Sequence, residues 1–73
     1  MTIGDRIKQA REAAGLTQQQ LADRLDIRAN GIQRVSGWET GVRTPNRSNV
    51  MRIAIATGAS AAWIEYGAGE MDG

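Results

Sequence analysis

The sequence predicts a single all-α domain of five helices. Apolar residues recur at the spacing of amphipathic helices in several short runs, and no segment alternates as a half-buried strand does. Glycines and small polar residues that favour helix ends separate these runs. The chain has 73 residues, of which 41% are apolar, so it has room for one small core and no second domain.

The first helix is expected over about residues 3–14 and ends at Gly15, because glycine readily adopts the positive φ of a helix C-terminus. The second helix begins at Thr17, since Gln20 follows three residues later and completes a capping box. The apolar faces consist of Ile3, Ile7 and Ala10 in the first helix and of Leu21, Ala22 and Leu25 in the second. Because the second helix has only about two turns, it depends on packing.

The third helix is expected at about residues 29–36, with Ile32 and Val35 facing the core. A fourth helix follows a loop that contains a proline, and either Asn46 or Ser48 caps it. These assignments place three short helices in the first half of the chain.

A short fifth helix is expected to begin after its capping residue, Ser60. The tail, residues 68–73, is acidic and rich in glycine, and we expect it to be flexible. The folded domain is therefore expected to span residues 1–67. We interpret Ile64 and Tyr66 as exposed apolar side chains, which together with the small core predict a two-fold homodimer.

The charge is distributed unevenly, although its formal sum is only +1. Residues 28–52 carry five arginines against one acid, a net charge of +4, whereas residues 53–73 carry three acids and no cation. Arginine forks onto phosphates and onto the edge of guanine. A basic block inside a near-neutral chain predicts a surface that faces a polyanion such as nucleic acid.

Several classes of function are excluded by composition. The chain has no Cys and no His, so disulfides, thiolate catalysis, cysteine zinc sites and histidine acid–base catalysis are ruled out. No paired carboxylates suggest another catalytic site, and we expect neither enzyme activity nor a cofactor or metal. No apolar run approaches the roughly 20 residues that span a bilayer, and no signal peptide is apparent. The sequence indicates a soluble, cytoplasmic binding module.

Two short helices joined by a tight connector, the second of them basic, are typical of a helix-turn-helix. In this motif the second helix offers its outer side to the major groove of DNA. Asn and Gln side chains bond adenine, and Arg bonds guanine. If Ile32 and Val35 face inward, the outward residues are Arg28, Ala29, Asn30, Gln33 and Arg34.

A family resemblance covers the chain from Ile3 to about Gly67. It rests on IGDRIKQAREAAGLTQQQLADRLDI, WETGVRTP and WIEYG, of which GLTQQQLADRLDI is the most characteristic. These segments resemble the phage repressor/Cro-type helix-turn-helix proteins. The resemblance implies a compact, lambda-repressor-like five-helix domain that binds operator DNA, usually as a dimer on a pseudo-palindrome. It implies that Gln18 contacts DNA, that the third helix reads bases, and that Arg43 and Arg47 in the following loop hold phosphates.

One departure from the family concerns the third helix. Between Leu25 and Trp38 the chain is about three residues longer than the usual spacing. If the extra residues follow the helix, the five outward residues named above take the reading positions. If they lie in the turn, the helix begins near Gly31, and the outward residues are Ile32, Gln33, Arg34 and Gly37. We favour the first register, because LDIRANGIQRV then matches the usual turn and helix without a gap; Gln33 and Arg34 are exposed in both.

The sequence therefore predicts a sequence-specific transcriptional regulator, Cro-like or repressor-type, that binds double-stranded operator DNA in the bacterial cytoplasm or nucleoid. It is expected to act as a homodimer that is weak off DNA, with no membrane contact. Two alternatives remain open. The chain is the N-terminal DNA-binding domain of a longer phage-type repressor, or it is an antitoxin-like module whose ligand is another protein.

Overall fold

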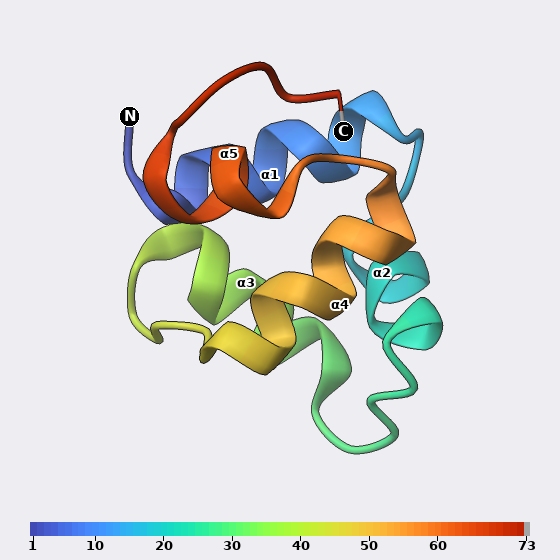
Figure 1. Cartoon of the computed structure of the whole chain (residues 1–73). Helices are drawn as coiled ribbons and strands as arrows, with labels where there is room; N and C mark the ends of the chain where they lie inside the picture. The colour runs from blue at the N-terminus through green and yellow to red at the C-terminus, as the bar shows by residue number, and fades with distance from the viewer. Residues whose placement is uncertain (73) are drawn as a thin grey trace.

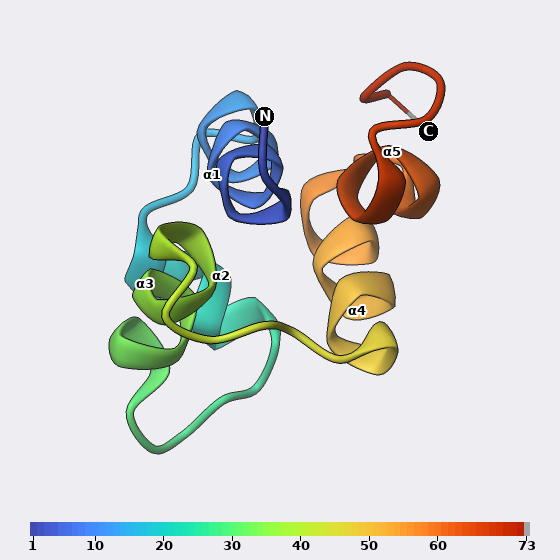
Figure 2. The same ribbon diagram turned by 90° about the vertical axis from the view of Figure 1, so that its left-hand side faces the viewer.

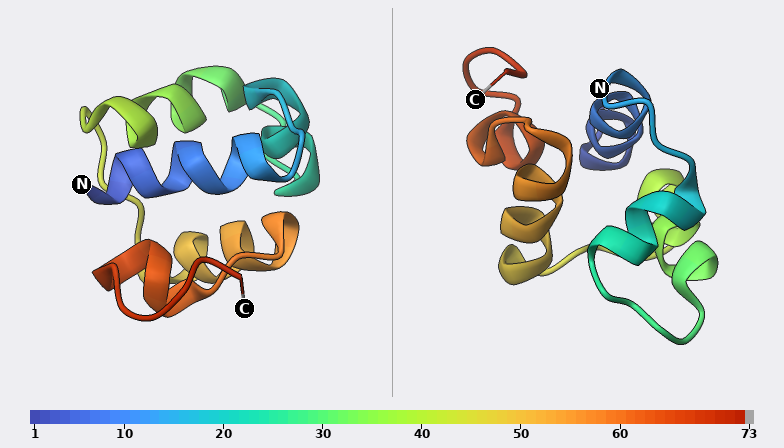
Figure 3. Two further views of the ribbon diagram at one scale, coloured as in Figure 1. Left: turned by 90° about the horizontal axis from the view of Figure 1, so that it is seen from above. Right: turned by 90° about the vertical axis from the view of Figure 1, so that its right-hand side faces the viewer.

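The structure is a computed structural model that describes residues 1–72, and it confirms the all-α, five-helix fold (Figure 1). The helices are α1 (Ile3–Ala13), α2 (Gln18–Arg24), α3 (Gly31–Thr40), α4 (Arg47–Thr57) and α5 (Ala61–Tyr66). Figure 2 shows α3 on the opposite side of the molecule from α4 and α5. Seen from above, α1 lies between α3 and the α4–α5 pair (Figure 3).

Four of the five helices begin where the sequence predicted, and a side-chain cap is present at each of these four starts. At α2 the Thr17 hydroxyl accepts a hydrogen bond from the Gln20 backbone N–H (3.1 Å), and the Gln20 side chain accepts one from the Thr17 N–H (2.9 Å). Asn46, and not Ser48, caps α4 by accepting from the Asn49 N–H, while Ser60 caps α5. These caps satisfy backbone donors that the first turn of a helix leaves without a partner.

The core contains residues from all five helices. Its fully buried large side chains are Ile7, Leu21, Leu25, Val35, Val50, Ile53 and Ile64. Two glycines allow the helices to approach one another. A Cβ on Gly4 would lie 2.5 Å from the Trp38 carbonyl oxygen, and a Cβ on Gly31 would lie 2.7 Å from the Ala22 Cβ. Gly4 of α1 and Gly31 of α3 therefore permit close contacts of α3 with α1 and α2 that a side chain at either position would prevent.

The expected third helix, residues 29–36, is wrong at both ends. The helix begins at Gly31 and runs to Thr40, so the extra residues lie in the turn, which is the register we did not favour. Residues 28–30 precede the helix, and Ile32 is 42% exposed where the favoured register buried it. The physical cause is the end of α2: Asp26 takes a positive φ of 56° and stops the helix where a glycine would be expected.

Of the two apolar residues expected to be exposed on α5, only one is. Tyr66 is 64% exposed, whereas Ile64 is 0% exposed and belongs to the core, so the expectation for Ile64 is wrong. Nearly every residue from 61 to 66 is apolar, so the sequence pattern did not show which side of α5 faces α1 and α4. A dimer contact through Ile64 is therefore excluded.

The tail returns toward the start of α5. The Ser60 N–H donates a hydrogen bond to the Met71 carbonyl oxygen (2.6 Å), and the half-buried Met71 side chain packs against the core. The expected flexibility of residues 68–73 stays a prediction, and Gly73 lies outside the residues that the structure describes.

Candidate nucleic-acid interface

The outer face of α3 is the first component of the candidate site. Val35 and Trp38 are buried on its inner side, whereas Gln33 and Arg34 are exposed, as both registers predicted. Ile32 adds a partly exposed apolar side chain beside them. Because α3 lies at the margin of the molecule, away from α4 and α5, this face is open to a large ligand (Figure 2).

Gly37, which the alternative register turned outward, is buried. The aliphatic part of the Arg43 side chain covers it, and a Cβ at Gly37 would lie 3.0 Å from the Arg43 Cδ. The Arg43 backbone N–H also donates to the Gly37 carbonyl oxygen (3.0 Å). The loop after α3 is therefore folded back against the helix, and it brings Arg43 beside the outer face.

Arg28, Ala29 and Asn30 reach the solvent from a loop instead of a helix. The Arg28 side chain is 87% exposed, and its Nε lies 3.4 Å from an oxygen of the exposed Asp26 carboxylate. Asn30 precedes α3 with a positive φ of 59°, and its side chain makes no capping hydrogen bond. The structure thus separates these three residues from the helical face that carries Gln33 and Arg34.

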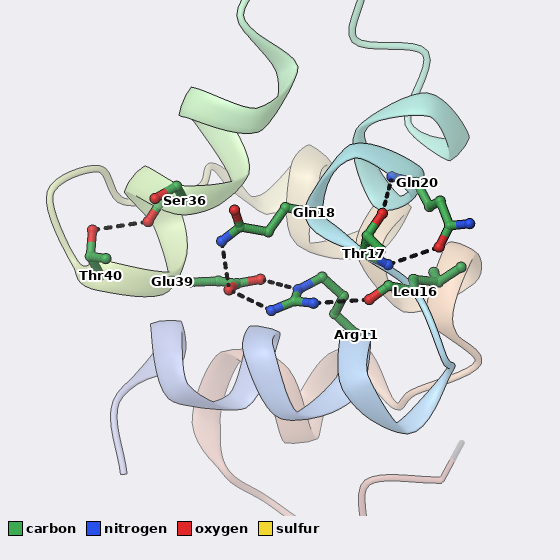
Figure 4. Close-up of polar contacts among 8 residues, drawn as sticks. All are labelled: Arg11, Leu16, Thr17, Gln18, Gln20, Ser36, Glu39 and Thr40. Carbon is green, nitrogen blue, oxygen red and sulfur yellow. Dashed lines mark hydrogen bonds and ion pairs between the residues drawn. The ribbon is translucent and has the colours of Figure 1, made fainter.

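A buried ion pair supports the start of α2 (Figure 4). The Arg11 guanidinium donates to both carboxylate oxygens of Glu39, at 2.6 and 3.0 Å, and to the Leu16 carbonyl oxygen at 2.9 Å. The Glu39 side chain is only 4% exposed, and its hydrogen bonds raise the pKa of the Arg11 guanidinium above the usual value. Arg11 therefore stays charged, and the pair ties α1, α3 and the segment before α2 together.

Gln18, the predicted DNA-contacting residue of α2, is held by the same carboxylate. Its Nε2 donates to the Glu39 Oε1 at 3.2 Å, and the residue is half-buried. The amide carbonyl Oε1 and the second N–H of Gln18 have no protein partner among the described residues. The arrangement holds the amide in place while leaving hydrogen-bonding capacity for a ligand.

A polar pocket lies between α3 and the start of α4. It is lined by Arg34, Trp38, Arg43, Thr44, Asn46 and Asn49. Two predicted residues, Arg34 and Arg43, therefore meet in one concave surface, and their guanidinium groups suit an anion. Sequence reasoning missed Thr44, Asn46 and Asn49 as lining residues, although the polar run TPNRSN was the available signal.

Arg47 stands apart from this pocket. It is the first residue of α4 and not a loop residue as expected, and its Nη1 donates to the Tyr66 hydroxyl (3.3 Å). The same nitrogen lies 3.8 Å from the Glu65 carboxylate. Arg47 is thus directed toward α5, and the structure does not bring it together with Arg34 and Arg43.

Two further properties concern residues 1–72 alone. Nowhere in this part of the chain do three or more acidic side chains gather in a way that suits a metal ion. Each of the five helices is too short to cross a membrane.

Comparison with known proteins is consistent with this geometry. A family model described as helix-turn-helix matches residues 7–64. The HTH-type transcriptional regulator ImmR of Bacillus subtilis is similar, with 33% identity over 54 residues. The matched region is 74% of this chain and 40% of ImmR, so the chain spans less than half the length of that relative.

Proposed function

Because the chain belongs to the helix-turn-helix family of DNA-binding regulators, we propose that it binds a specific operator in double-stranded DNA and regulates transcription as a Cro-like or repressor-type protein. The outer face of α3 carries this proposal. Val35 and Trp38 are buried on one side of α3, while Gln33 and Arg34 are exposed. A helix with such a face fits the major groove.

In the proposed complex, Gln33 and Arg34 read bases. A Gln amide pairs with adenine N6 and N7, and a guanidinium pairs with guanine O6 and N7. Ile32 supplies an apolar contact of the kind that suits a thymine methyl group. These three side chains lie in the first turn and a half of α3, the part of a recognition helix that enters the groove.

Phosphates are bound on either side of α3 in this proposal. Gln18 offers its free amide groups at the start of α2, and Arg43 offers its guanidinium from the loop before α4. Arg47 contacts a DNA phosphate farther from α3, once its hydrogen bond to the Tyr66 hydroxyl is broken. Ala29 and Asn30 remain predicted contacts, approaching DNA from the loop before α3 instead of from the helix.

The active species is proposed to be a homodimer that is weak off DNA. The exposed Tyr66 side chain and the small core support the dimer. Ile64 is buried and does not take part in the contact. A two-fold dimer protects two half-sites about 34–36 Å apart, one turn of the duplex. Footprinting at saturation measures this spacing, and protection of one isolated half-site by one chain would contradict the dimer.

Selection of binding sites from random duplex DNA tests the main proposal. The wild-type chain is expected to enrich one motif, and Arg34→Ala is expected to lose discrimination at one position by about 1–3 kcal/mol. Arg24→Ala is the matched control, because this arginine donates to the Ala56 carbonyl oxygen on the α4 side. It should return the wild-type motif. Failure of the wild-type chain to enrich any sequence would favour the protein-binding alternative.

A further inference from the structure

The loop between α2 and α3, residues 25–30, has a fixed shape at its first end. The Asp26 N–H donates to the Asp23 carbonyl oxygen and the Ile27 N–H to the Ala22 carbonyl oxygen, both at 3.0 Å. This pair of bonds is a Schellman motif, with Asp26 in the left-handed position. The half-buried Ile27 side chain packs against the core, so the loop is anchored directly after the motif.

The second end of the loop is fixed by packing. Gly31 packs so closely against Ala22 that a Cβ at this position would clash. At the first end, Arg52 of α4 also donates a hydrogen bond to the carbonyl oxygen of Leu25. Arg28 and Ala29 therefore occupy the tip of a loop whose two ends are both held.

Backbone strain is concentrated in the same loop. Within residues 1–72, Asp26 and Asn30 are the two non-glycine residues with positive φ, at 56° and 59°. Such conformations persist only where surrounding contacts impose them, and they are enriched at functional sites. The loop projects beyond the helices at the lower end of the molecule, on the α3 side and away from α4 and α5 (Figures 1 and 2).

The Arg28 guanidinium at the tip of the loop can replace its weak ion pair with Asp26 by a contact with another anion. Arg28 pairs with Asp26 across 3.4 Å, and both side chains are largely exposed. An exposed pair of this kind contributes little to stability, because water screens both charges. A phosphate accepts hydrogen bonds from a guanidinium more strongly than an exposed carboxylate held at that distance does.

We propose that the α2–α3 loop is a second DNA-contacting element, in which Arg28 binds a backbone phosphate beside the base pairs that face the first turn of α3. This inference rests on the proposed function. A recognition helix enters the groove by its N-terminal end, so a loop leading into it lies at the groove edge, where the phosphates are. Because the loop is already held at both ends, binding orders little more than the Arg28 side chain.

Asp26 opposes this contact in the proposal. Its carboxylate competes for Arg28 and repels the incoming phosphate. Asp26→Asn removes the charge and keeps a residue that tolerates positive φ. The variant is expected to bind operator DNA about two- to fivefold more tightly at low salt, the range that corresponds to an exposed charge pair.

The decisive experiment measures the operator affinity of Arg28→Ala at several salt concentrations. The slope of log K against log salt is expected to become less steep by about 0.9, the value for one phosphate contact, with an unchanged selected motif. Ethylation interference should disappear at one phosphate. Arg28→Lys should keep the slope, and Arg24→Ala, which removes an arginine directed at α4, should leave slope and interference unchanged.

Two results would overturn the inference while leaving the proposed function intact. One is a wild-type slope for Arg28→Ala, and the other is a change of base preference at one position, which would assign Arg28 to a base. A wild-type chain that binds no duplex at all would overturn the proposed function and this inference with it. Urea unfolding of each variant verifies that the compared chains are folded.

Discussion

The two helices of the motif begin in opposite ways. At the start of α2, Thr17 and Gln20 form a complete capping box, and the buried Arg11–Glu39 pair supports the segment before it. At the start of α3, Asn30 makes no side-chain cap and the preceding loop is exposed and strained. The start of α2 is stabilised by hydrogen bonds and an ion pair. The start of α3 is stabilised by the packing of α3 itself.

This difference separates two tasks within one small motif. The segment that holds Gln18 is fixed by polar contacts reaching from α1 and α3. The loop that leads into the candidate reading face is held at its two ends, while Arg28, Ala29 and Asn30 between them are exposed. Variants at the two helix starts should therefore differ in the size and even the sign of their effects.

The largest effect is expected at the buried pair. Glu39→Ala leaves Arg11 charged and nearly buried without its carboxylate partner, and breaking such a pair costs about 3–5 kcal/mol of unfolding free energy. Urea unfolding followed by circular dichroism measures the loss. The double variant Arg11→Met/Glu39→Leu should recover most of it, and a loss below about 1 kcal/mol for Glu39→Ala would show that the pair does not support α2.

The packing contact at the start of α3 comes next. Gly31→Ala puts a methyl group into the space occupied by Ala22, and overpacking of this kind costs about 1–3 kcal/mol. Combining it with Ala22→Gly removes the clash, so the double variant should be more stable than Gly31→Ala alone. If urea unfolding gave the single and the double variant equal stability, the Gly31–Ala22 contact would not limit the distance between α2 and α3.

At the start of α2, loss of the cap has a smaller effect. Thr17→Ala removes the hydroxyl that accepts from the Gln20 N–H and should cost about 1 kcal/mol. Thr17→Ser keeps the acceptor and serves as the control. Thermal unfolding that ranks the alanine and serine variants equally would contradict a capping role.

In the α2–α3 loop a substitution is expected to increase the free energy of unfolding instead of lowering it. Asp26→Gly relieves a left-handed backbone, and the gain should be about 0.5 kcal/mol because the entropy of the added glycine offsets part of it. Asp23→Gly at an exposed position within α2 should instead destabilise by about 0.3 kcal/mol, the difference between the helix propensities of Asp and Gly. Chemical denaturation of the two variants compares these opposite signs directly.

The smallest expected effect contrasts two capping boxes under acid. The Thr2 backbone N–H donates to the Asp5 carboxylate and lowers its pKa below the usual 3.8. A lowered carboxyl pKa adds stability that is present above the usual pKa and is lost as the pH falls through the folded value. Asp5→Asn should therefore lose less stability than the wild type between pH about 5 and about 2.

The neutral box at α2 supplies the matched control. Gln20→Glu introduces a carboxylate in the position of Asp5, and it should add an acid-sensitive component that the wild-type α2 lacks. Thermal unfolding at several pH values measures both variants. Identical pH profiles for the wild type and Asp5→Asn would show that the α1 box does not depend on ionisation.

The sequence predicted those elements whose determinants are local. Thr17, Asn46 and Ser60 each satisfy a backbone N–H within three residues, so a short pattern is sufficient to recognise them. The start of α3 was missed, because Asp26 holds a position that glycine usually occupies and the spacing alone allowed both registers. Exposure of Gln33 and Arg34 did not depend on that choice, and it is confirmed.

The sequence also did not predict contacts between residues far apart in the chain. Glu39 entered the charge pattern as the one acid of a basic block, yet it is buried against Arg11, 28 positions earlier in the chain. Glu39 therefore pairs with an arginine outside the basic block and with none of the arginines inside it. The meeting of Arg34 and Arg43 in one pocket likewise depends on how the loop before α4 folds back, which no spacing predicts.

The return of the tail to Ser60 has a practical consequence for surface-based kinetics. The hydrogen bond from Ser60 to Met71 keeps this segment beside α5, at the end of the molecule opposite the α2–α3 loop (Figure 1). Since the sequence contains no cysteine, Glu70→Cys would introduce a single thiol for coupling to a sensor chip or a fluorophore. A chain tethered there would present α3 and the loop to the flowing solution, with the anchor on the far side.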